Sequence, residues 1–199
     1  GKTIVAVLAA LSAVENNYQA AVMAPTELLA EQHLINFSKW LEHLGIKIAW
    51  LSGQLKGKAR EKSLEQIKSG EANIIIGTHA LFQEGVEFHH LALIIVDEQH
   101  RFGVHQRLAL REKGFKNSCY PHQLIMTATP IPRTLAMSAY ADLDHSIIDE
   151  LPPGRTPVQT VAISNDRRAE VIVPKPHPAQ FIKKIYWVCT LIDESEFLQ

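Results

Sequence analysis

The stretch from Leu93 to His100 constrains the fold more than any other part of the chain. It consists of four apolar residues followed at once by two carboxylates, an amide and an imidazole. An uninterrupted apolar run is typical of a strand that is buried on both faces in a parallel sheet. Because ligands of such sheets bind beyond the carboxyl ends of the strands, the sequence predicts that Asp97 and Glu98 lie at a reaction site.

Two neighbouring acids at such an edge indicate nucleotide chemistry. Carboxylates are costly to bury unless a cation or a water molecule to be activated gives them a purpose. We therefore expect Asp97 to coordinate Mg²⁺ and Glu98 to position or deprotonate the attacking water. Gln99 and His100 complete the set of catalytic candidates. His100 either has a structural role, as lone histidines more often do, or senses the γ-phosphate from its place beside a hydrolytic acid. A plain strand-to-turn junction is the alternative interpretation, since these residue types also favour turns.

The first three residues, Gly1, Lys2 and Thr3, lead into an apolar segment with a helical pattern. They match the last positions of the phosphate-binding loop G-x-x-x-x-G-K-[ST]. In such a loop the lysine contacts the β- and γ-phosphates, the threonine hydroxyl coordinates Mg²⁺, and the helix N-terminus contributes its dipole and free N–H groups. The tripeptide is weak support alone, but together with the acid-terminated strand it predicts a nucleoside triphosphate hydrolase. The abrupt start leads us to expect a fragment.

Composition limits the class of protein. The 199 residues are 46% hydrophobic, which suits one domain with a core plus a remainder. A formal net charge of −1 argues against a generally basic nucleic-acid protein, although a local basic groove is compatible with it. Cys119 and Cys189 lie far apart, so we expect free thiols. No signal peptide or membrane-spanning apolar run is visible, which favours a cytoplasmic protein without membrane contact.

Strand-like and helical patterns alternate up to about residue 150. In one helical segment, Leu34, Phe37, Leu41 and Leu44 repeat at three- and four-residue spacing and predict one apolar face. The lysine-rich segment 56–68 is interpreted as a solvated helix face rather than a DNA contact. Alternation of this kind predicts an α/β fold with a parallel sheet and helices on both faces. The expected strands are 20–24, 46–51, 73–77, 91–97 and 123–127.

The pattern changes after residue 150. Residues 151–157 contain three prolines and a glycine, which predicts a linker. Residues 158–163 are strand-like, so we expect 158–199 to be the incomplete start of a second α/β domain. Three further prolines between residues 174 and 178 fit an extended segment better than a helix.

Small polar residues follow several of the other expected strands. Thr127 and Thr129 follow the last of these strands, where their hydroxyls either link His100 to a neighbouring domain or cap a helix. The ends of three earlier strands offer backbone amides and hydroxyls that would suit phosphodiester oxygens of DNA. Plain helix capping explains the same residues, and the residue types alone favour it. The DNA-binding candidates are Pro25, Thr26, Glu27, Gly53, Thr78 and His79.

Taken together, these segments resemble superfamily 2 helicases and translocases. The opening tripeptide matches the end of the first ATP-binding motif, APTELLAEQH and GTHAL match DNA-contacting motifs, DEQH matches the DExH box, and TAT matches the coupling motif. The segments DEQHRFGVHQRLALREKG, HQLIMTATPIPRTLAMSAYADLD, IDELPPGRTPV and YWVCTLIDESE resemble those of bacterial helicases that act on branched DNA. Transcription–repair coupling translocases are similar around RFGV and TATPIPRTL and less similar in the last two segments. The proline-rich stretch 171–185 departs from the pattern.

The resemblance implies a RecA-like first motor domain over 1–150, a linker over 151–157 and the start of a second motor domain over 158–199. It implies ATP and Mg²⁺ as cofactors and branched double-stranded DNA as the partner, in recombination and repair. It also implies that Thr127 and Thr129 relay the nucleotide state. A wedge domain and most of the second motor domain, which supplies an arginine to the reaction, would lie outside these residues. We therefore expect the isolated chain to be nearly inactive, with a non-catalytic binding remnant as the alternative.

Overall fold

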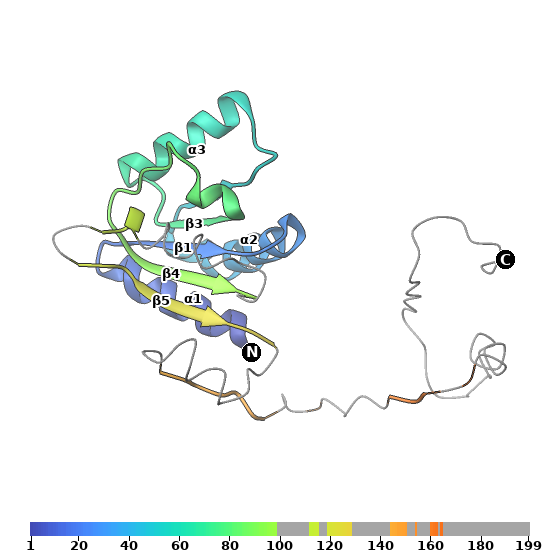
Figure 1. Cartoon of the computed structure of the whole chain (residues 1–199). Coiled ribbons are helices and arrows are strands. Elements are labelled where there is room, and N and C mark those ends of the chain that lie inside the picture. The colour runs from blue at the N-terminus through green and yellow to red at the C-terminus, as the bar shows by residue number, and fades with distance from the viewer. Residues whose placement is uncertain are drawn as a thin grey trace, which may run out of the picture. The chain divides into compact units, whose positions relative to one another are not determined.

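A five-stranded parallel sheet, in the order β2-β3-β1-β4-β5, forms the centre of the structure (Figure 1). The computed structural model describes residues 1–98, 112–115, 119–128, 144–150, 154, 160–162 and 164. The strands agree with those predicted from the sequence to within two residues at each end. They are β1 (Gln19–Met23), β2 (Ile48–Leu51), β3 (Ile74–Gly77), β4 (Leu91–Asp97) and β5 (His122–Met126).

Helices cover both faces of this sheet, as the alternating pattern predicted. One face carries α1 (Lys2–Glu15) and α2 (Glu27–Leu41), which bury Val7 and Phe37 against it. The other face carries α3 (Gly57–Ser69) and the short 3-10 helix η2 (His79–Phe82), which bury Ile67 and Leu81. The α/β class is therefore confirmed for the unit Gly1–Pro152. The expected linker at 151–157 and second domain at 158–199 lie outside the described residues, apart from 154, 160–162 and 164.

The period of two along the central strand explains why the fold has two cores. Ala20 and Val22 of β1 point to the layer with α1 and α2, while Ala21 and Met23 point to the layer with α3. All residues of β1 are buried. A strand with both faces covered is apolar over most of its length, and β1 is apolar from Ala20 to Met23 after the buried Gln19.

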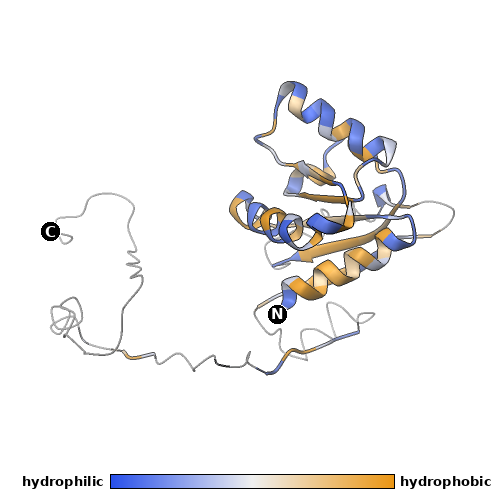
Figure 2. Cartoon of the chain, turned by 180° about the vertical axis from the view of Figure 1, so that it is seen from behind, coloured by the Kyte–Doolittle hydropathy of each residue, from blue (hydrophilic) through white to orange (hydrophobic). Residues whose placement is uncertain are grey.

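Hydropathy differs sharply between the helices (Figure 2). Helix α1 is apolar over most of its length, whereas α3 is largely hydrophilic and buries only Ile67 fully. The burial in α3 agrees with a solvated helix face for segment 56–68. Because most apolar area of α3 is concentrated at its end, that end anchors the helix to the sheet.

The predicted apolar face of α2 is correct except at Leu44. Phe37 and Leu41 are buried, but Leu44 is 58% exposed. The α-helix ends at Leu41, and a 3-10 turn, η1 (Glu42–Leu44), follows it before Gly45 reverses the chain at φ 67°. Since a 3-10 turn has three residues per turn, Leu44 falls outside the stripe that faces the core.

Candidate nucleotide-binding site

The start of α1 and the end of β4 lie at the same edge of the sheet. Helix α1 precedes β1 and runs antiparallel to it, so the first turn of α1 lies where the strands end. In Figure 1 the N-terminus lies beside the arrowheads of β4 and β5. The charge of Lys2 is close enough to Asp97 to lower the pKa of that carboxyl group. Lys2 and Asp97 are far apart in the sequence, but the fold brings them close enough for the charge of one to act on the other.

Asp97 is the last residue of β4, and both of its carboxylate oxygens accept hydrogen bonds. Oδ2 lies 2.8 Å from Nε2 of His33, and Oδ1 accepts from the backbone N–H of Glu98 at 3.0 Å. Burial acts to raise the pKa of Asp97, but the hydrogen bond and charge of His33, the Glu98 amide and the charge of Lys2 together lower it. The carboxylate is thus kept ionised although only 13% of its side chain is exposed.

Glu98 has an unusual backbone. Its φ is 48°, in the left-handed region that residues other than glycine rarely adopt. Such conformations persist where the surrounding structure enforces them, and they are concentrated at functional sites. The bend occurs directly after the buried strand and turns the chain just beyond Asp97. Glu98 itself is partly exposed at the sheet edge.

The other predicted nucleotide residues are divided between this edge and the undescribed part of the chain. Gly1 caps α1 without a side-chain hydrogen bond, and Thr3 lies partly buried in the first turn. Thr127 follows β5 directly, and the pairing of Asp97 with Met126 brings it to the same edge. Three further predicted residues, Gln99, His100 and Thr129, lie outside the described residues.

The ends of β1, β2 and β3 form a second group at this edge. The backbone N–H of Ala24 donates to the carbonyl of Gly77 at 3.0 Å, and that of Thr78 donates to the carbonyl of Leu51 at 3.2 Å. Strand β2 and β3 approach so closely that a Cβ on Gly77 would lie 1.9 Å from the Leu51 carbonyl oxygen. The three segments predicted to contact DNA are therefore neighbours in space.

Within this group the predicted DNA residues differ in exposure. Gly53 and His79 are both exposed, and an ideal Cβ on Gly53 would lie 3.6 Å from Cε1 of the His79 ring. Thr26 is exposed, but its hydroxyl accepts from the Leu29 backbone N–H at 3.3 Å, which makes it a helix cap. Its neighbours Pro25 and Glu27 are partly exposed.

Thr78 differs from the other DNA candidates because it is only 2% exposed. Its hydroxyl is buried, with no hydrogen-bond partner among the described residues. At this position only a change in the surrounding loop would bring the hydroxyl to a ligand, whereas the exposed His79 is directly accessible.

His33 belongs to the site and was not predicted from the sequence. It is 5% exposed on the buried face of α2, and its Nε2 contacts Asp97. A signal was present, because Ala30, His33, Phe37 and Leu41 follow the three- and four-residue spacing of the core-facing stripe. A histidine on such a stripe needs a polar partner, and the end of a neighbouring strand supplies it.

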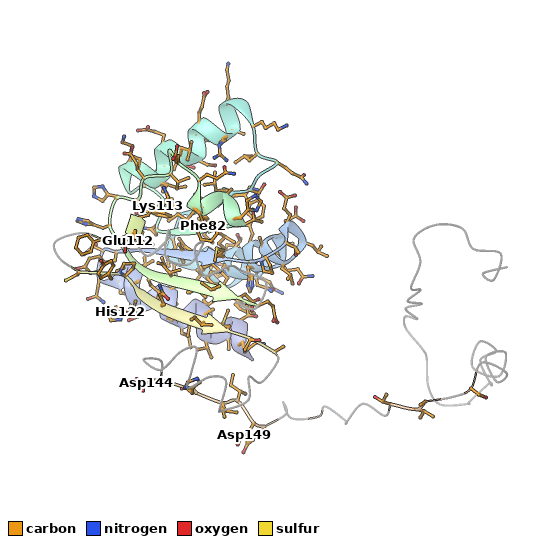
Figure 3. All side chains as sticks on the ribbon, in the orientation of Figure 1. Phe82, Glu112, Lys113, His122, Asp144 and Asp149 are labelled. Carbon is orange, nitrogen blue, oxygen red and sulfur yellow. The ribbon has the colours of Figure 1, made fainter. Side chains whose placement is uncertain are left out.

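The opposite edge, where the strands begin, is separate from this site. Figure 3 shows Glu112, Lys113 and His122 at that end of the sheet. The Lys113 ammonium donates to the carbonyl of Val86 at 3.1 Å. A groove of about 610 Å³ opens there, lined by residues including Tyr120 and His122. It is remote from Asp97, and we assign it no part in nucleotide chemistry.

Neither a multidentate metal cluster nor a membrane span occurs in the part of the chain that the structure describes. No group of three or more His, Cys, Asp or Glu side chains converges there. No described helix is both long and apolar enough to cross a bilayer. Cys119 is an exposed free thiol, while Cys189 lies outside the described residues.

Comparison with known proteins agrees with this architecture. The chain is 67% identical over 200 residues to the ATP-dependent DNA helicase RecG of Pasteurella multocida and 63% identical over 201 residues to that of Escherichia coli K12. Both alignments cover the whole chain but only 29% of the relative's length. A structure of RecG bound to a three-way DNA junction matches 86% of this chain and 22% of its own, with a TM-score of 0.71 and 42% identity.

These matches confirm the resemblance to RecG helicases and the RecA-like fold. The DEAD/DEAH box helicase family matches residues 1–138, which include both the Lys2 segment and the Asp97 segment. The chain therefore belongs to the DEAD/DEAH box helicase family.

Proposed function

We propose that this chain forms the first motor domain of an ATP-dependent helicase that remodels branched DNA, such as stalled forks and Holliday junctions. The observation that carries the proposal is that α1, which begins at Lys2, and β4, which ends at Asp97, present these ends at the same edge of a parallel sheet. The names of the relatives, and the three-way junction bound in the related structure, support branched DNA as the substrate. A chain that acts on chromosomal DNA with ATP would work in the cytoplasm.

The residues at this edge of the sheet would have different roles in ATP hydrolysis. Lys2 and the first N–H groups of α1 would hold the β- and γ-phosphates, with Gly1 allowing their close approach. Glu98, in its strained backbone position, would orient and deprotonate the attacking water. His100, Thr127 and Thr129 would pass the nucleotide state to the second motor domain, as the resemblance implies, and Gln99 would remain a catalytic candidate beside Glu98.

Asp97 and Thr3 have the chemistry that Mg²⁺ requires. The ion prefers hard oxygen ligands and binds through one or two protein groups, completing its shell with water and substrate phosphates. Asp97 is ionised and partly exposed at the strand end, and Thr3 offers a hydroxyl in the first turn of α1. When bound, Mg²⁺ would neutralise charge that develops on the phosphates.

The DNA would lie along the ends of β1, β2 and β3. Thr26, Gly53 and His79 are exposed at these strand ends, and Gly53 lies beside the His79 ring. Backbone amides there can bind phosphodiester oxygens without reading sequence. Pro25, Glu27 and Thr78 would belong to the same surface but contribute less to DNA contact than the exposed residues.

Hydrolysis is tested by Glu98→Gln in a polypeptide of the relatives' full length that contains this sequence, hereafter the full-length polypeptide. The amide keeps the size of the side chain but cannot accept a proton, so ATPase activity should fall by about 10²-fold or more while ATP binding persists. Glu84→Gln is the matched control, because Glu84 is exposed in the turn that follows η2. Retained hydrolysis in Glu98→Gln would remove Glu98 from its proposed role.

DNA binding is tested separately by titrating a labelled three-way junction with the 199-residue chain at a series of salt concentrations. True phosphate contacts give a log–log slope of about −0.9 per contact. A nonfunctional remnant would show no saturable binding, whereas a non-catalytic binding module would bind DNA without hydrolysing ATP. A preference for linear duplex over the junction would favour a coupling-type translocase.

A further inference from the structure

His33 joins helix α2 to the strand that ends in Asp97, although the two residues are 64 positions apart. Nε2 of His33 lies 2.8 Å from Oδ2 of Asp97, and only 7% of the His33 side chain is exposed. An ionised carboxylate can only accept a hydrogen bond, so Nε2 carries the proton and donates it. Hydrogen bonds to ionised groups are about twice as strong as neutral ones.

The other contacts of the ring explain why this position needs a histidine. Phe37, one helical turn further, is fully buried and meets the His33 ring edge-to-face with centroids 6.3 Å apart. Nδ1 of His33 is buried without a hydrogen-bond partner among the described residues. Because an unpartnered polar atom is costly to bury, packing alone would favour an apolar residue here. The hydrogen bond to Asp97 is what accounts for the imidazole.

That hydrogen bond restricts the orientation of the carboxylate. Oδ1 of Asp97 is already held by the Glu98 backbone N–H, and His33 holds Oδ2. Each oxygen keeps a second lone pair that can face a cation or its bound water. Without His33, only one of the two oxygens would be fixed, and the carboxylate could rotate about χ2.

The place of His33 in α2 connects this restriction to the DNA side of the site. Helix α2 begins immediately after Thr26, one of the proposed DNA contacts. His33 follows Thr26 by seven residues, about 10 Å along the helix axis. A continuous helix therefore runs from the proposed DNA surface to the hydrogen bond on Asp97.

We propose that His33 is a positioning residue, which orients the Asp97 carboxylate for the Mg²⁺–nucleotide complex and conveys shifts of α2 to it. The proposal rests on the proposed function, because it takes Asp97 as the acid that faces Mg²⁺. Outer residues that hydrogen-bond metal ligands orient those ligands, and their removal typically weakens metal affinity about 10–100-fold.

The first experiment measures the Mg²⁺ concentration that gives half-maximal binding of a fluorescent ATP analogue to the full-length polypeptide. His33→Leu should raise this concentration about tenfold or more, with binding in the absence of Mg²⁺ unchanged. His33→Gln should stay close to wild type, because its amide N–H reaches nearly the position of Nε2. His43→Leu is the control, since His43 is exposed in η1.

Two outcomes would overturn the positioning role. One is a folded His33→Leu variant with the wild-type Mg²⁺ dependence. The other is a folded His33→Gln variant as impaired as His33→Leu, which would indicate packing rather than a donated hydrogen bond. If the wild-type polypeptide shows no Mg²⁺ dependence at all, the proposed function fails instead, so the two failures are distinguishable.

The connection to DNA is tested by adding a three-way junction to the same titration. Since coupling is reciprocal, DNA that shifts α2 should change the Mg²⁺ midpoint in wild type and in His33→Gln. The change should be lost in His33→Leu. An equal shift in all three, or no shift in wild type, would contradict the transmitting role.

The donated hydrogen bond can also be tested without any substitution, so the test does not depend on variants that fold. Nitrogen-15 NMR of the histidine rings in the unsubstituted chain should show that Nε2 of His33 is protonated. A bare Nε2 would make the donated hydrogen bond impossible and would overturn the proposal.

Discussion

The amino edge of the sheet depends on a single buried side chain, Gln19, which is 4% exposed. Its amide nitrogen donates to the carbonyls of Ile67 at 2.9 Å and Ala72 at 2.8 Å. Its amide oxygen accepts from the backbone N–H groups of His89 at 2.8 Å and His90 at 3.1 Å. One side chain thus forms hydrogen bonds with backbone groups at the end of α3, before β3 and in the loop before β4. Gln19→Leu would remove all of these hydrogen bonds while keeping a similar volume.

The expected loss can be estimated group by group. The Ile67 carbonyl also accepts from the Gly70 backbone N–H at 3.3 Å, and the exposed His89 can bond to water instead. The groups at Ala72 and His90 therefore carry most of the cost. At about 1–3 kcal/mol for each of these two groups left unsatisfied, the free energy of unfolding should fall by about 2–6 kcal/mol.

Urea denaturation of the 199-residue chain, followed by circular dichroism, measures this difference. Gln32→Leu is the control, because Gln32 is exposed in α2 and the two residue types have similar helix propensity. It should change the free energy of unfolding by less than about 0.5 kcal/mol. A Gln19→Leu variant as stable as the control would show that the Gln19 hydrogen bonds do not stabilise the fold.

Three further predictions follow from other contacts. Gly77→Ala would place a Cβ 1.9 Å from the Leu51 carbonyl oxygen and should destabilise the chain by about 3 kcal/mol or more. In Gly53→Ala the new Cβ would meet only the His79 ring, at 3.6 Å, so this control should remain folded. Thermal denaturation of the two variants measures the difference. Because the folded-state pKa of Asp97 is lowered, its contribution to stability is present above about pH 4 and is lost as the pH falls through the folded value. Asp97→Asn should flatten that part of the stability–pH curve, and an unchanged slope would count against the pKa shift. The 199-residue chain should hydrolyse ATP about 10³-fold or more slowly than the full-length polypeptide, since an arginine from another domain can contribute that much, and equal turnover in a coupled assay would contradict this.

The centre of the sheet could be predicted from the sequence because β1 and β3 are buried on both faces and β4 is apolar up to its last residue. Strands of this kind are mainly apolar, and a polar residue marks the end of the apolar run, as Asp97 does in β4. The exposure of Leu44 could not be predicted, because the change from an α-helix to a 3-10 turn depends on how Gly45 reverses the chain.

The site was predictable where its parts are local and unpredictable where they are tertiary. In the Lys2 and Asp97 segments the functional residues are consecutive in the sequence, so each motif can be recognised locally. The parallel topology of the sheet then brings the two segments to one edge. The contact between His33 and Asp97 joins residues 64 positions apart, so no local pattern shows it. The burial of Thr78 also depends on packing around its loop, which its neighbours in sequence do not reveal.

A crystal structure of the full-length polypeptide with Mg²⁺ and a non-hydrolysable ATP analogue tests the shared nucleotide site most directly. We expect Lys2 Nζ at the β- and γ-phosphates and Asp97 facing the Mg²⁺ of the same nucleotide, with His33 still bonded to its carboxylate. A nucleotide bound away from the start of α1, or an Asp97 that faces no part of its Mg²⁺ shell, would contradict this expectation.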